Sequence, residues 1–272
     1  NALLNCQYYK KRKLIVRKNE ISIQLYTTRK FEPLNEVLEF ISNSGISNVE
    51  LFGLESINVG SIKDLLESNN LMCHSAHTSY ESIHDYKETI HKAKLLNIKH
   101  VIVPAPPKKN DGDFKNSFDI NEQDWMSFGK KLSSYVSIFE DNGLTLGYHN
   151  HSYEFISLPS GKLPIECVMD QSENLKFEID LGWTTAGGAD PSIWVERYAN
   201  KIIACHLKDF YFKDKDMLDH SNQSAVGDGF INWRELINKI KKKNCNLFII
   251  EHDDPKDYKN YISKSLSNLS SI

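Results

Sequence analysis

The chain of 272 residues is 40% hydrophobic and 25% charged, and its formal net charge is −3. Such a length and composition are typical of a globular protein with one large domain or two small ones around a substantial core. The net charge gives no electrostatic footprint for nucleic acid or an anionic membrane. No apolar run approaches the ~20 residues that cross a bilayer. We therefore expect neither nucleic acid nor a membrane as a partner.

The cysteines predict a reducing compartment. They are five in number, widely spaced and without a C-x-x-C pair, which favours free thiols over a disulfide framework. Cys73, Cys205 and Cys245 lie in or beside apolar strand patterns and are expected to be small buried hydrophobes. We expect a cytoplasmic protein, although the chain starts at Asn1 rather than at Met, which leaves the question of an export signal open.

From residue 21 onward, short β-rich segments alternate with segments of helical periodicity. The basic, poorly patterned residues 1–20 are expected to form an extension before this fold. The expected strands are Ile21–Thr27, Asn48–Phe52, Leu71–His77, Val101–Pro104, one that starts at Leu144, Leu175–Asp180, Ile202–Asp209 and Leu247–Glu251. The expected helices are Pro33–Ser44, Ser61–Asn69, Tyr86–Leu96, Asn121–Asp141, Pro191–Ala199, Trp233–Lys243 and one from Pro255 onward.

This alternation predicts the fold class. Strands and helices that alternate eight times over roughly 250 residues are typical of an α/β protein with a (β/α)₈ TIM barrel. We therefore expect one barrel domain over residues 21–272. A doubly wound open sheet is the alternative, but no G-x-G-x-x-G motif follows the first strand.

Ionisable side chains gather where the last four expected strands end. Side chains two apart on a strand share a face, and a barrel builds its active site at these C-terminal ends. The groups concerned are His149, His151, Glu178, Asp180, His206, Lys208 and Glu251. Burying so many charges without partners would cost several kcal/mol each. One divalent cation would offset this cost, and the mixed nitrogen and oxygen ligands suit Mn²⁺, Zn²⁺, Co²⁺ or Fe²⁺. A salt-bridged barrel core without a metal is the alternative.

The strand ends also carry an ordered series of short motifs. These are Gln24–Arg29 (QLYTTR), Tyr148–His151 (YHNH) with Glu154–Phe155, Glu178–Trp183 (EIDLGW), Gly187–Gly188 before Asp190–Pro191, His206–Asp209 (HLKD), Val226–Gly229 (VGDG) and Ile250–Glu251. In this series the chain resembles the sugar phosphate isomerase/epimerase branch of the xylose-isomerase-like TIM barrels. The resemblance runs from about Ile21 to the C-terminus. It is specific for the superfamily and does not name a substrate.

The resemblance implies one divalent metal ion with ligands from four strands. Carried onto this chain, the ligands are His149, Asp180, His206 and Glu251. The better-studied epimerases have Glu where His149 stands, and they use it together with the last Glu as an acid–base pair. His149 therefore argues against a symmetrical two-Glu epimerisation. Either Glu154 or His151 moves the second proton, or one face has no base and the chemistry is isomerisation or elimination.

Metal-assisted removal of a proton next to a carbonyl is the mechanism that fits these residues. Glu251 is the first candidate for the base, and His151 and Glu154 are the second. Lys208 is expected to neutralise an oxyanion or bind a substrate carboxylate or phosphate; a salt bridge to Asp209 or Glu178 is its alternative.

Three further side chains are expected to line the substrate pocket. Trp183 could stack on a sugar face, with packing as its alternative. His77 ends the third strand and Gln24 lies in the first, with core hydrogen bonding as the alternative for both. Gly227 and Gly229 suit a tight turn, with a phosphate cradle as the alternative. We expect substrate specificity to lie in the polar loop at residues 106–117.

The leading hypothesis is a metal-dependent isomerase or epimerase of a keto sugar or related polyol derivative. The alternative enzyme is a metal-dependent lyase or dehydratase that acts on an oxidised sugar or glycoside. Endonuclease-IV-like DNA repair would need more histidine ligands and a basic groove, and a non-catalytic sugar-binding barrel would lack a usable base. The expected partner is a small carbohydrate; the sequence leaves homo-oligomer formation open.

Overall fold

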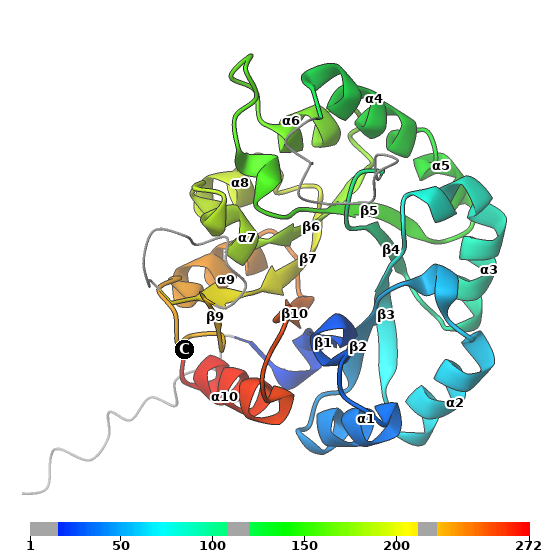
Figure 1. Cartoon of the computed structure of the whole chain (residues 1–272), viewed down its shortest axis with the longest axis vertical. Coiled ribbons are helices and arrows are strands. Elements are labelled where there is room, and N and C mark those ends of the chain that lie inside the picture. Colours follow the sequence, from blue (N-terminus) through cyan, green and yellow to red (C-terminus); the bar gives the residue numbers. More distant parts are fainter. Residues whose placement is uncertain (1–15, 108–119, 212–221) are drawn as a thin grey trace, which may run out of the picture.

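Eight parallel strands close into a barrel with helices around it in this computed structural model, which describes residues 16–107, 120–211 and 222–272 (Figure 1). The strands are β1 (Ile21–Gln24), β2 (Asn48–Leu51), β3 (Met72–His77), β4 (His100–Val103), β5 (Thr145–His149), β6 (Lys176–Asp180), β7 (Ile202–Leu207) and β10 (Phe248–Ile250). Neighbours in the chain are neighbours in the barrel, and β1 pairs with β10 to close it. The predicted TIM barrel is confirmed.

The register brings the strand ends together. Asp180 on β6 pairs with His206 on β7, and His149 on β5 pairs with Glu178 on β6. On the other side of the closure, Gln24 on β1 pairs with Glu50 on β2. Parallel strands place all their C-terminal ends at one end of the barrel. Side chains far apart in the sequence therefore converge at that end.

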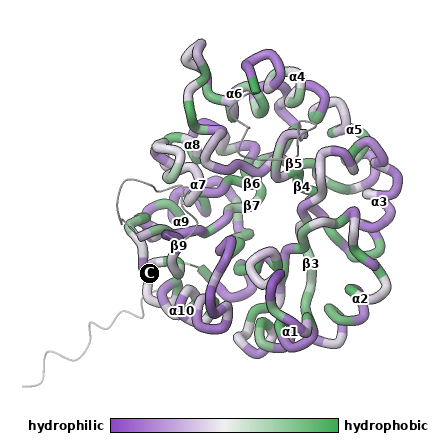
Figure 2. Tube along the Cα trace, viewed as in Figure 1, coloured by the Kyte–Doolittle hydropathy of each residue, from purple (hydrophilic) through white to green (hydrophobic). Residues whose placement is uncertain are grey.

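The helices lie outside the strands and turn one apolar face inward (Figures 1 and 2). In α9, for example, Trp233, Ile237 and Ile240 are buried at helical spacing. The helices are α1 (Leu34–Asn43), α2 (Val59–Ser68), α3 (Tyr86–Leu95), α4 (Glu122–Ser133), α5 (Val136–Asp141), α6 (Pro164–Met169), α7 (Leu181–Ala186), α8 (Pro191–Arg197), α9 (Trp233–Lys241) and α10 (Tyr258–Ser271). Strand and helix aliphatics form one buried core.

Short elements connect the ends of the strands to the helices. The 3-10 turns are η1 (Lys18–Glu20), η2 (Leu25–Thr28), η3 (Leu54–Ser56), η4 (Glu81–Asp85) and η6 (Tyr153–Phe155). After β7, the two-residue strands β8 (Asp209–Phe210) and β9 (Gln223–Ser224) form a small antiparallel pair. The first expected strand is therefore shorter than predicted, since the chain turns into η2 at Leu25, and the seventh ends at Leu207 rather than at Asp209.

Two helix predictions need correction. The expected helix over residues 121–141 is two helices, α4 and α5, because the Ser134 hydroxyl bonds back to the Lys131 carbonyl where the chain turns. The second helix begins at Val59 rather than at Ser61, because the side chain of Asn58 accepts a hydrogen bond from the Ser61 backbone N–H. The sequence also missed α6 and α7, which follow β5 and β6.

Residues 1–15 and 108–119 lie outside the described residues, so the expected extension and most of the expected specificity loop are not described. Val16 is buried, and Glu20 forms an ion pair with Lys241 on α9. The boundary between extension and barrel stays a prediction. Cys73, Cys205 and Cys245 are buried free thiols as expected, and Cys167 is a fourth. Across the described ranges, we find no helix long and apolar enough to cross a membrane.

Candidate metal and active site

The four predicted metal ligands meet at the C-terminal end of the barrel. His149 ends β5, Asp180 ends β6, His206 lies on β7 and Glu251 directly follows β10. Each offers a ligand atom, and these atoms all lie within 4.8 Å of one another. All four residues are buried, and Glu251 is the most exposed of them at 6%. The tertiary structure therefore brings together the ligand group that the resemblance implied.

A cation fits this group on grounds that the structure itself provides. The Oδ2 atom of Asp180 is buried and makes no hydrogen bond to the described residues, whereas Oδ1 accepts one from the Trp183 backbone N–H. An unpaired buried carboxylate oxygen is costly unless something compensates it. Nδ1 of His206 lies 2.9 Å from Glu251 Oε2, and the group thus offers two imidazoles and two carboxylates with ligand atoms within 4.8 Å of one another. Such a mixed donor set suits Zn²⁺, Mn²⁺, Co²⁺ or Fe²⁺.

Burial and neighbouring charges set the ionisation of this group. Burial keeps His149 neutral, with its pKa well below the usual value, as nearby imidazoles also disfavour a charge. Burial raises the pKa of Asp180 to about 7, although Lys208 and His206 oppose the shift. In Glu251 burial is outweighed by the charges of Lys208 and His206, which lower the pKa to about 2. Glu251 is thus an ionised carboxylate at the C-terminal end of the barrel.

Lys208 is a buried cation among carboxylates. Its Nζ lies 2.7 Å from Asp253 Oδ1, 3.0 Å from Glu251 Oε2 and 3.8 Å from Asp180 Oδ2. Although burial opposes its charge, these carboxylates raise the pKa of Lys208. The side chain is therefore an ammonium ion and not a base. Neither Asp209 nor Glu178, the salt-bridge partners considered from the sequence, is the partner found.

Trp183 lies close to this cation. The Lys208 Nζ sits 4.7 Å from the centre of the Trp183 ring, and the ring of His151 is 6.2 Å away. Trp183 itself is 3% exposed. This position agrees with an aromatic wall beside the ligand group, although contact between Trp183 and a sugar stays a prediction.

The two alternative bases differ in their surroundings. Glu154 is fully buried, and its carboxylate accepts hydrogen bonds from the Tyr148 hydroxyl at 2.5 Å and from the His151 backbone N–H at 2.8 Å. Burial raises the pKa of Glu154 to about 8. His151 is half-buried, and its ring stacks on Tyr153. Burial together with the Lys208 charge lowers its pKa to about 4, so the imidazole is neutral. The side chain of Glu154 is therefore held by two protein hydrogen bonds, whereas the His151 ring is held mainly by stacking on Tyr153.

A second layer of polar side chains lies next to the ligands, and the sequence pointed to only part of it. Glu50, on β2, is fully buried and contacts His206 Nε2 at 2.8 Å and His77 Nε2 at 3.2 Å. It was missed because a single Glu in a short apolar strand gives no motif, although a carboxylate in a buried strand was a usable signal. Gln24 donates to Glu50 at 2.7 Å and accepts from the Tyr26 backbone N–H.

His77 lies between two carboxylates of this layer. Its Nε2 is 2.6 Å from Glu178 Oε2 and 3.2 Å from Glu50 Oε1. Burial opposes the charge, but these carboxylates raise the pKa of His77 to about 10. The amide of Gln24 and the imidazole of His77 are thus bonded to protein groups. Their expected contact with substrate stays a prediction, and such a contact would compete with these bonds.

The loop with Gly227 and Gly229 is held by a side chain of the protein. The Asp209 carboxylate accepts hydrogen bonds from both glycine N–H groups, at 2.9 and 3.1 Å, and from Trp233 Nε1 at 2.7 Å. A Cβ on Gly229 would lie 2.1 Å from Asp209 Oδ1. The carboxylate fills the space that a phosphate would need. The loop is therefore the tight turn expected from the sequence, and not the phosphate cradle given as its alternative.

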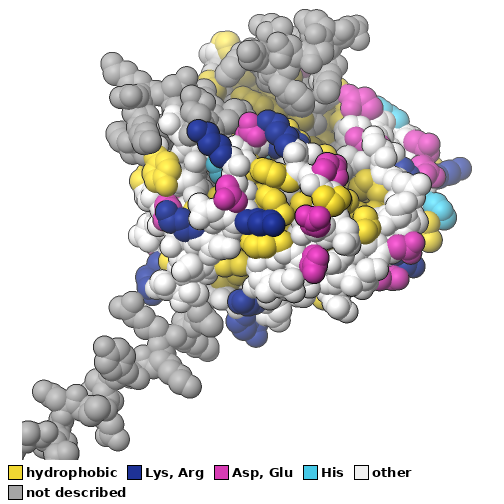
Figure 3. All heavy atoms as spheres, turned by 60° about the horizontal axis from the view of Figure 1, so that its bottom comes forward, with side chains coloured by type: hydrophobic (Ala, Val, Ile, Leu, Met, Phe, Trp, Pro, Cys, Tyr) yellow, Lys and Arg dark blue, Asp and Glu magenta, His cyan; other side chains and the backbone are white. Residues whose placement is uncertain are grey.

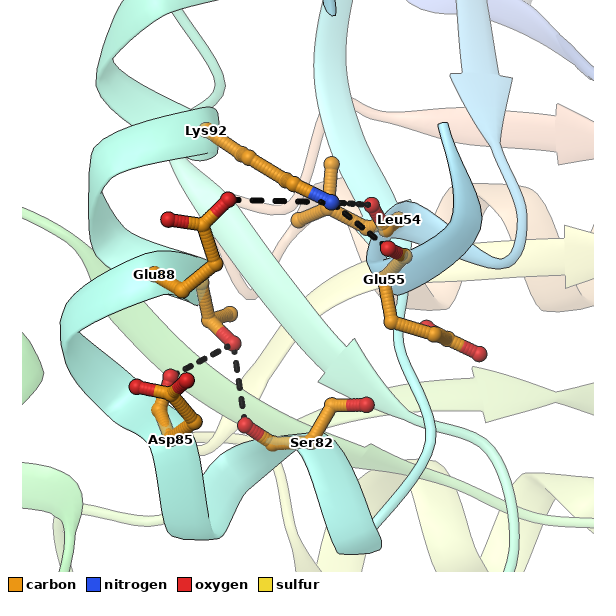
Figure 4. Close-up of a pocket in the computed structure, with 7 residues that line it drawn as sticks. Leu54, Glu55, Ser82, Asp85, Glu88 and Lys92 are labelled. Atoms are coloured by element: carbon orange, nitrogen blue, oxygen red, sulfur yellow. Dashed lines mark hydrogen bonds and ion pairs between the residues drawn. The ribbon is translucent and has the colours of Figure 1, made fainter. Parts of the chain in front are cut away.

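A hollow of about 200 Å³ lies at the rim of the barrel, between η3 and α3 (Figure 4). Its cation, Lys92, donates to the carbonyl oxygens of Leu54 and Glu55 and pairs with Glu88. Because the Lys92 ammonium already binds these protein groups, we assign no ligand to this hollow. On the face displayed in Figure 3, positive and negative side chains are intermingled among hydrophobic ones.

Comparison with known proteins agrees with this geometry. The family model described as xylose isomerase-like TIM barrel matches residues 32–272. The chain belongs to this family. The predicted resemblance is therefore confirmed.

Several named proteins are similar to this chain at low identity. An inosose dehydratase of Clostridium perfringens is 22% identical, over 75% of this chain and 80% of that protein. A sugar phosphate isomerase/epimerase of Parabacteroides distasonis has a TM-score of 0.74 at 20% identity, over 94% of this chain and 95% of that one. The IolI protein, whose structure holds a zinc atom, has a TM-score of 0.67 at 14% identity, over 91% and 95% of the two chains. The first two of these proteins carry names of enzymes, and the two solved structures share the fold.

Proposed function

We propose that this xylose isomerase-like barrel is a divalent-metal-dependent enzyme that removes a proton next to the carbonyl of a keto sugar or cyclic keto polyol. The observation that carries the proposal is the convergence of His149, Asp180, His206 and Glu251, in which the buried Asp180 Oδ2 accepts no hydrogen bond from the described residues. When bound there, a divalent cation would polarise the carbonyl and favour an enediolate. The named relatives support carbohydrate chemistry.

Glu251 is the base in this proposal. It is ionised, belongs to the ligand group and keeps some exposure, so it can take the α-proton of a bound substrate. Lys208 supplies a fixed positive charge 3.0 Å from Glu251, which suits the negative charge that develops on the substrate oxygen. Glu154 receives no part in proton transfer, because Tyr148 and the His151 backbone occupy its carboxylate.

We infer that the enediolate then loses a β-hydroxyl as water, which makes the enzyme a dehydratase. In this step the enediolate oxygen reforms the carbonyl, the electron pair of the enediolate double bond forms the new double bond between the α- and β-carbons, and the C–O bond at the β-carbon breaks. The hydroxide leaves as water with the proton that Glu251 took from the α-carbon. One base suffices for this sequence, whereas the two-Glu epimerisation needs a carboxylate where His149 stands. The similarity to an inosose dehydratase supports the same outcome. Isomerisation by return of the proton from Glu251 is the second candidate, supported by the similarity to a sugar phosphate isomerase/epimerase.

A keto inositol in D₂O tests both outcomes at once. The protein is loaded with Mn²⁺, Co²⁺, Zn²⁺ or Fe²⁺, and the product mass is followed with time. Dehydration gives a product lighter by one water, whereas isomerisation gives deuterium uptake without that loss. A panel of keto sugars is then tested in the same way. If no metal supports either change on any of these substrates, the proposed function is wrong.

Glu251→Gln separates the base from the ligand role. We expect this variant to lose turnover, read as water loss or as deuterium uptake, by more than ~10²-fold, because general base catalysis contributes about that much. Its metal content is measured beside its activity. Loss of turnover with retained metal assigns the base to Glu251, and unchanged turnover would assign it elsewhere.

A further inference from the structure

Two buried carboxylates lie behind the histidines of the ligand group. Glu178 Oε2, on β6, is 3.2 Å from Nδ1 of His149 and 3.1 Å from Nε2 of His206. Glu50 Oε1, on β2, is 2.8 Å from the same Nε2 of His206. One carboxylate therefore contacts both imidazoles of the ligand group, and a second carboxylate contacts one of them.

The ring of His206 shows which nitrogen faces which partner. Nδ1 faces Glu251, and Nε2 faces Glu50 and Glu178. An imidazole that binds a metal through one nitrogen donates the proton on its other nitrogen to a carboxylate, carbonyl or water. A proton on Nε2 of His206 therefore satisfies the carboxylates and leaves the lone pair of Nδ1 on the side of Glu251.

His149 shows the complementary arrangement. Its buried Nδ1 and the buried Oε1 of Glu178 both make no hydrogen bond to the described residues, although Nδ1 lies 3.2 Å from the other oxygen of the same carboxylate. If Nδ1 of His149 carries the proton, a small rotation of the ring lets it donate a hydrogen bond to the Glu178 carboxylate. Both the imidazole nitrogen and the carboxylate are then satisfied. The lone pair of His149 then lies on Nε2.

We propose that Glu178 and Glu50 are positioning residues of the metal site. Glu178 holds His149 and His206 in the tautomers and ring orientations that present a lone pair to the cation, and Glu50 fixes His206 a second time. The inference rests on the proposed function, because it concerns a cation at the group His149, Asp180, His206 and Glu251. It adds residues that do not touch the cation or the substrate.

The same atoms could instead hold a second cation, because His77, His149, Glu178 and His206 also lie within 4.8 Å of one another. Their spacing favours hydrogen bonds. His77 Nε2 lies 2.6 Å from Glu178 Oε2, which is a short hydrogen-bond distance and is closer than the 2.9 Å between His206 Nδ1 and Glu251 Oε2. Glu50 further accepts hydrogen bonds from Gln24 and Ser75. Protein donors thus complete this layer.

Cobalt binding tests the inference without recourse to activity. Metal-free wild type and Glu178→Gln are titrated with Co²⁺ against a competing chelator, the visible Co²⁺ absorption is recorded, and the stoichiometry is measured by elemental analysis. We expect one equivalent in both proteins and a 10- to 100-fold weaker affinity in Glu178→Gln, with a changed Co²⁺ spectrum. Glu50→Gln should weaken binding less, since it contacts one imidazole.

Two further variants separate position from charge. Glu178→Asp keeps the charge but withdraws the carboxylate from both imidazoles, so it should also weaken Co²⁺ binding. Glu39→Gln, an exposed position on α1, removes the same charge far from the ligand group and should leave binding unchanged. Circular dichroism of each metal-free protein checks its fold. Should Glu178→Gln not fold, Glu178→Asp and Glu50→Gln carry the test.

The outcomes are distinct. Wild-type affinity and spectrum in Glu178→Gln, Glu178→Asp and Glu50→Gln would overturn the positioning role while leaving the proposed function standing. Two equivalents in wild type and one in Glu178→Gln would make Glu178 a ligand of a second cation, which also overturns it. A wild-type protein that binds no Co²⁺, Zn²⁺ or Mn²⁺ would overturn the proposed function itself.

Discussion

Glu154→Gln should make the protein more stable at neutral and alkaline pH. Burial raises the pKa of Glu154 from 4.5 to about 8, so between these values the native state holds a proton that the unfolded state has released. Wild-type stability therefore falls as the pH rises through this window. Each pKa unit is worth 1.36 kcal/mol, and the shift from 4.5 to about 8 gives about 5 kcal/mol in full. Between pH 5 and pH 8 the variant should gain about 4 kcal/mol relative to wild type.

Glutamine is a fair mimic of the protonated side chain. Its carbonyl can accept from the His151 backbone N–H and its amide can donate to the Tyr148 oxygen, as a neutral carboxyl group would. Urea unfolding of the metal-free proteins at pH 5, 6, 7 and 8 measures the free energy of unfolding of the variant and of wild type. The contributions of the other titrating groups cancel in the difference between the two proteins. Glu39→Gln on the exposed face of α1 is the control and should show no such slope. A difference between Glu154→Gln and wild type that stays constant from pH 5 to pH 8 would refute the reasoning.

Three other outcomes follow from the structure. Lys208→Met leaves the neighbouring buried carboxylates without their cation. It should lower the free energy of unfolding of the metal-free protein by about 3–5 kcal/mol at pH 7, measured by urea titration. A loss below about 1 kcal/mol would mean that the Lys208 ion pairs do not stabilise the fold. Gly229→Ala should lower the free energy of unfolding by about 1–3 kcal/mol or more, because its Cβ would lie 2.1 Å from a carboxylate oxygen. The control is Gly60→Ala in the open first turn of α2, which should be neutral or stabilising. Thermal unfolding measures both variants. Zinc at 100 times its dissociation constant should stabilise wild type by about 2.7 kcal/mol and His206→Ala hardly at all; equal shifts in thermal scans would argue against the ligand group.

The sequence by itself determined the fold class and the strand ends at which the polar side chains meet. Strand-like and helical periods alternate clearly enough to predict the barrel, and the fold then places the ends of β5 to β7 and the start of the β10 loop together. His149, Asp180, His206 and Glu251 could therefore be grouped before any distance was known, through the resemblance and the alternation of side chains along each strand. Local periodicity suffices for this, because barrel topology turns strand ends into neighbours.

Only the tertiary structure decided which partner each buried group has. Glu154 and Glu251 are both acidic residues near a strand end, yet Glu154 is bonded to Tyr148, and Glu251 lies beside Lys208 and His206. Their pKa values accordingly move in opposite directions. A carboxylate in a buried strand marked Glu50 as unusual, but its partners His77 and His206 could not be read from the sequence because they lie on β3 and β7. Burial and charge pairing depend on distances across the closed sheet, and those distances are set by the register of all eight strands together.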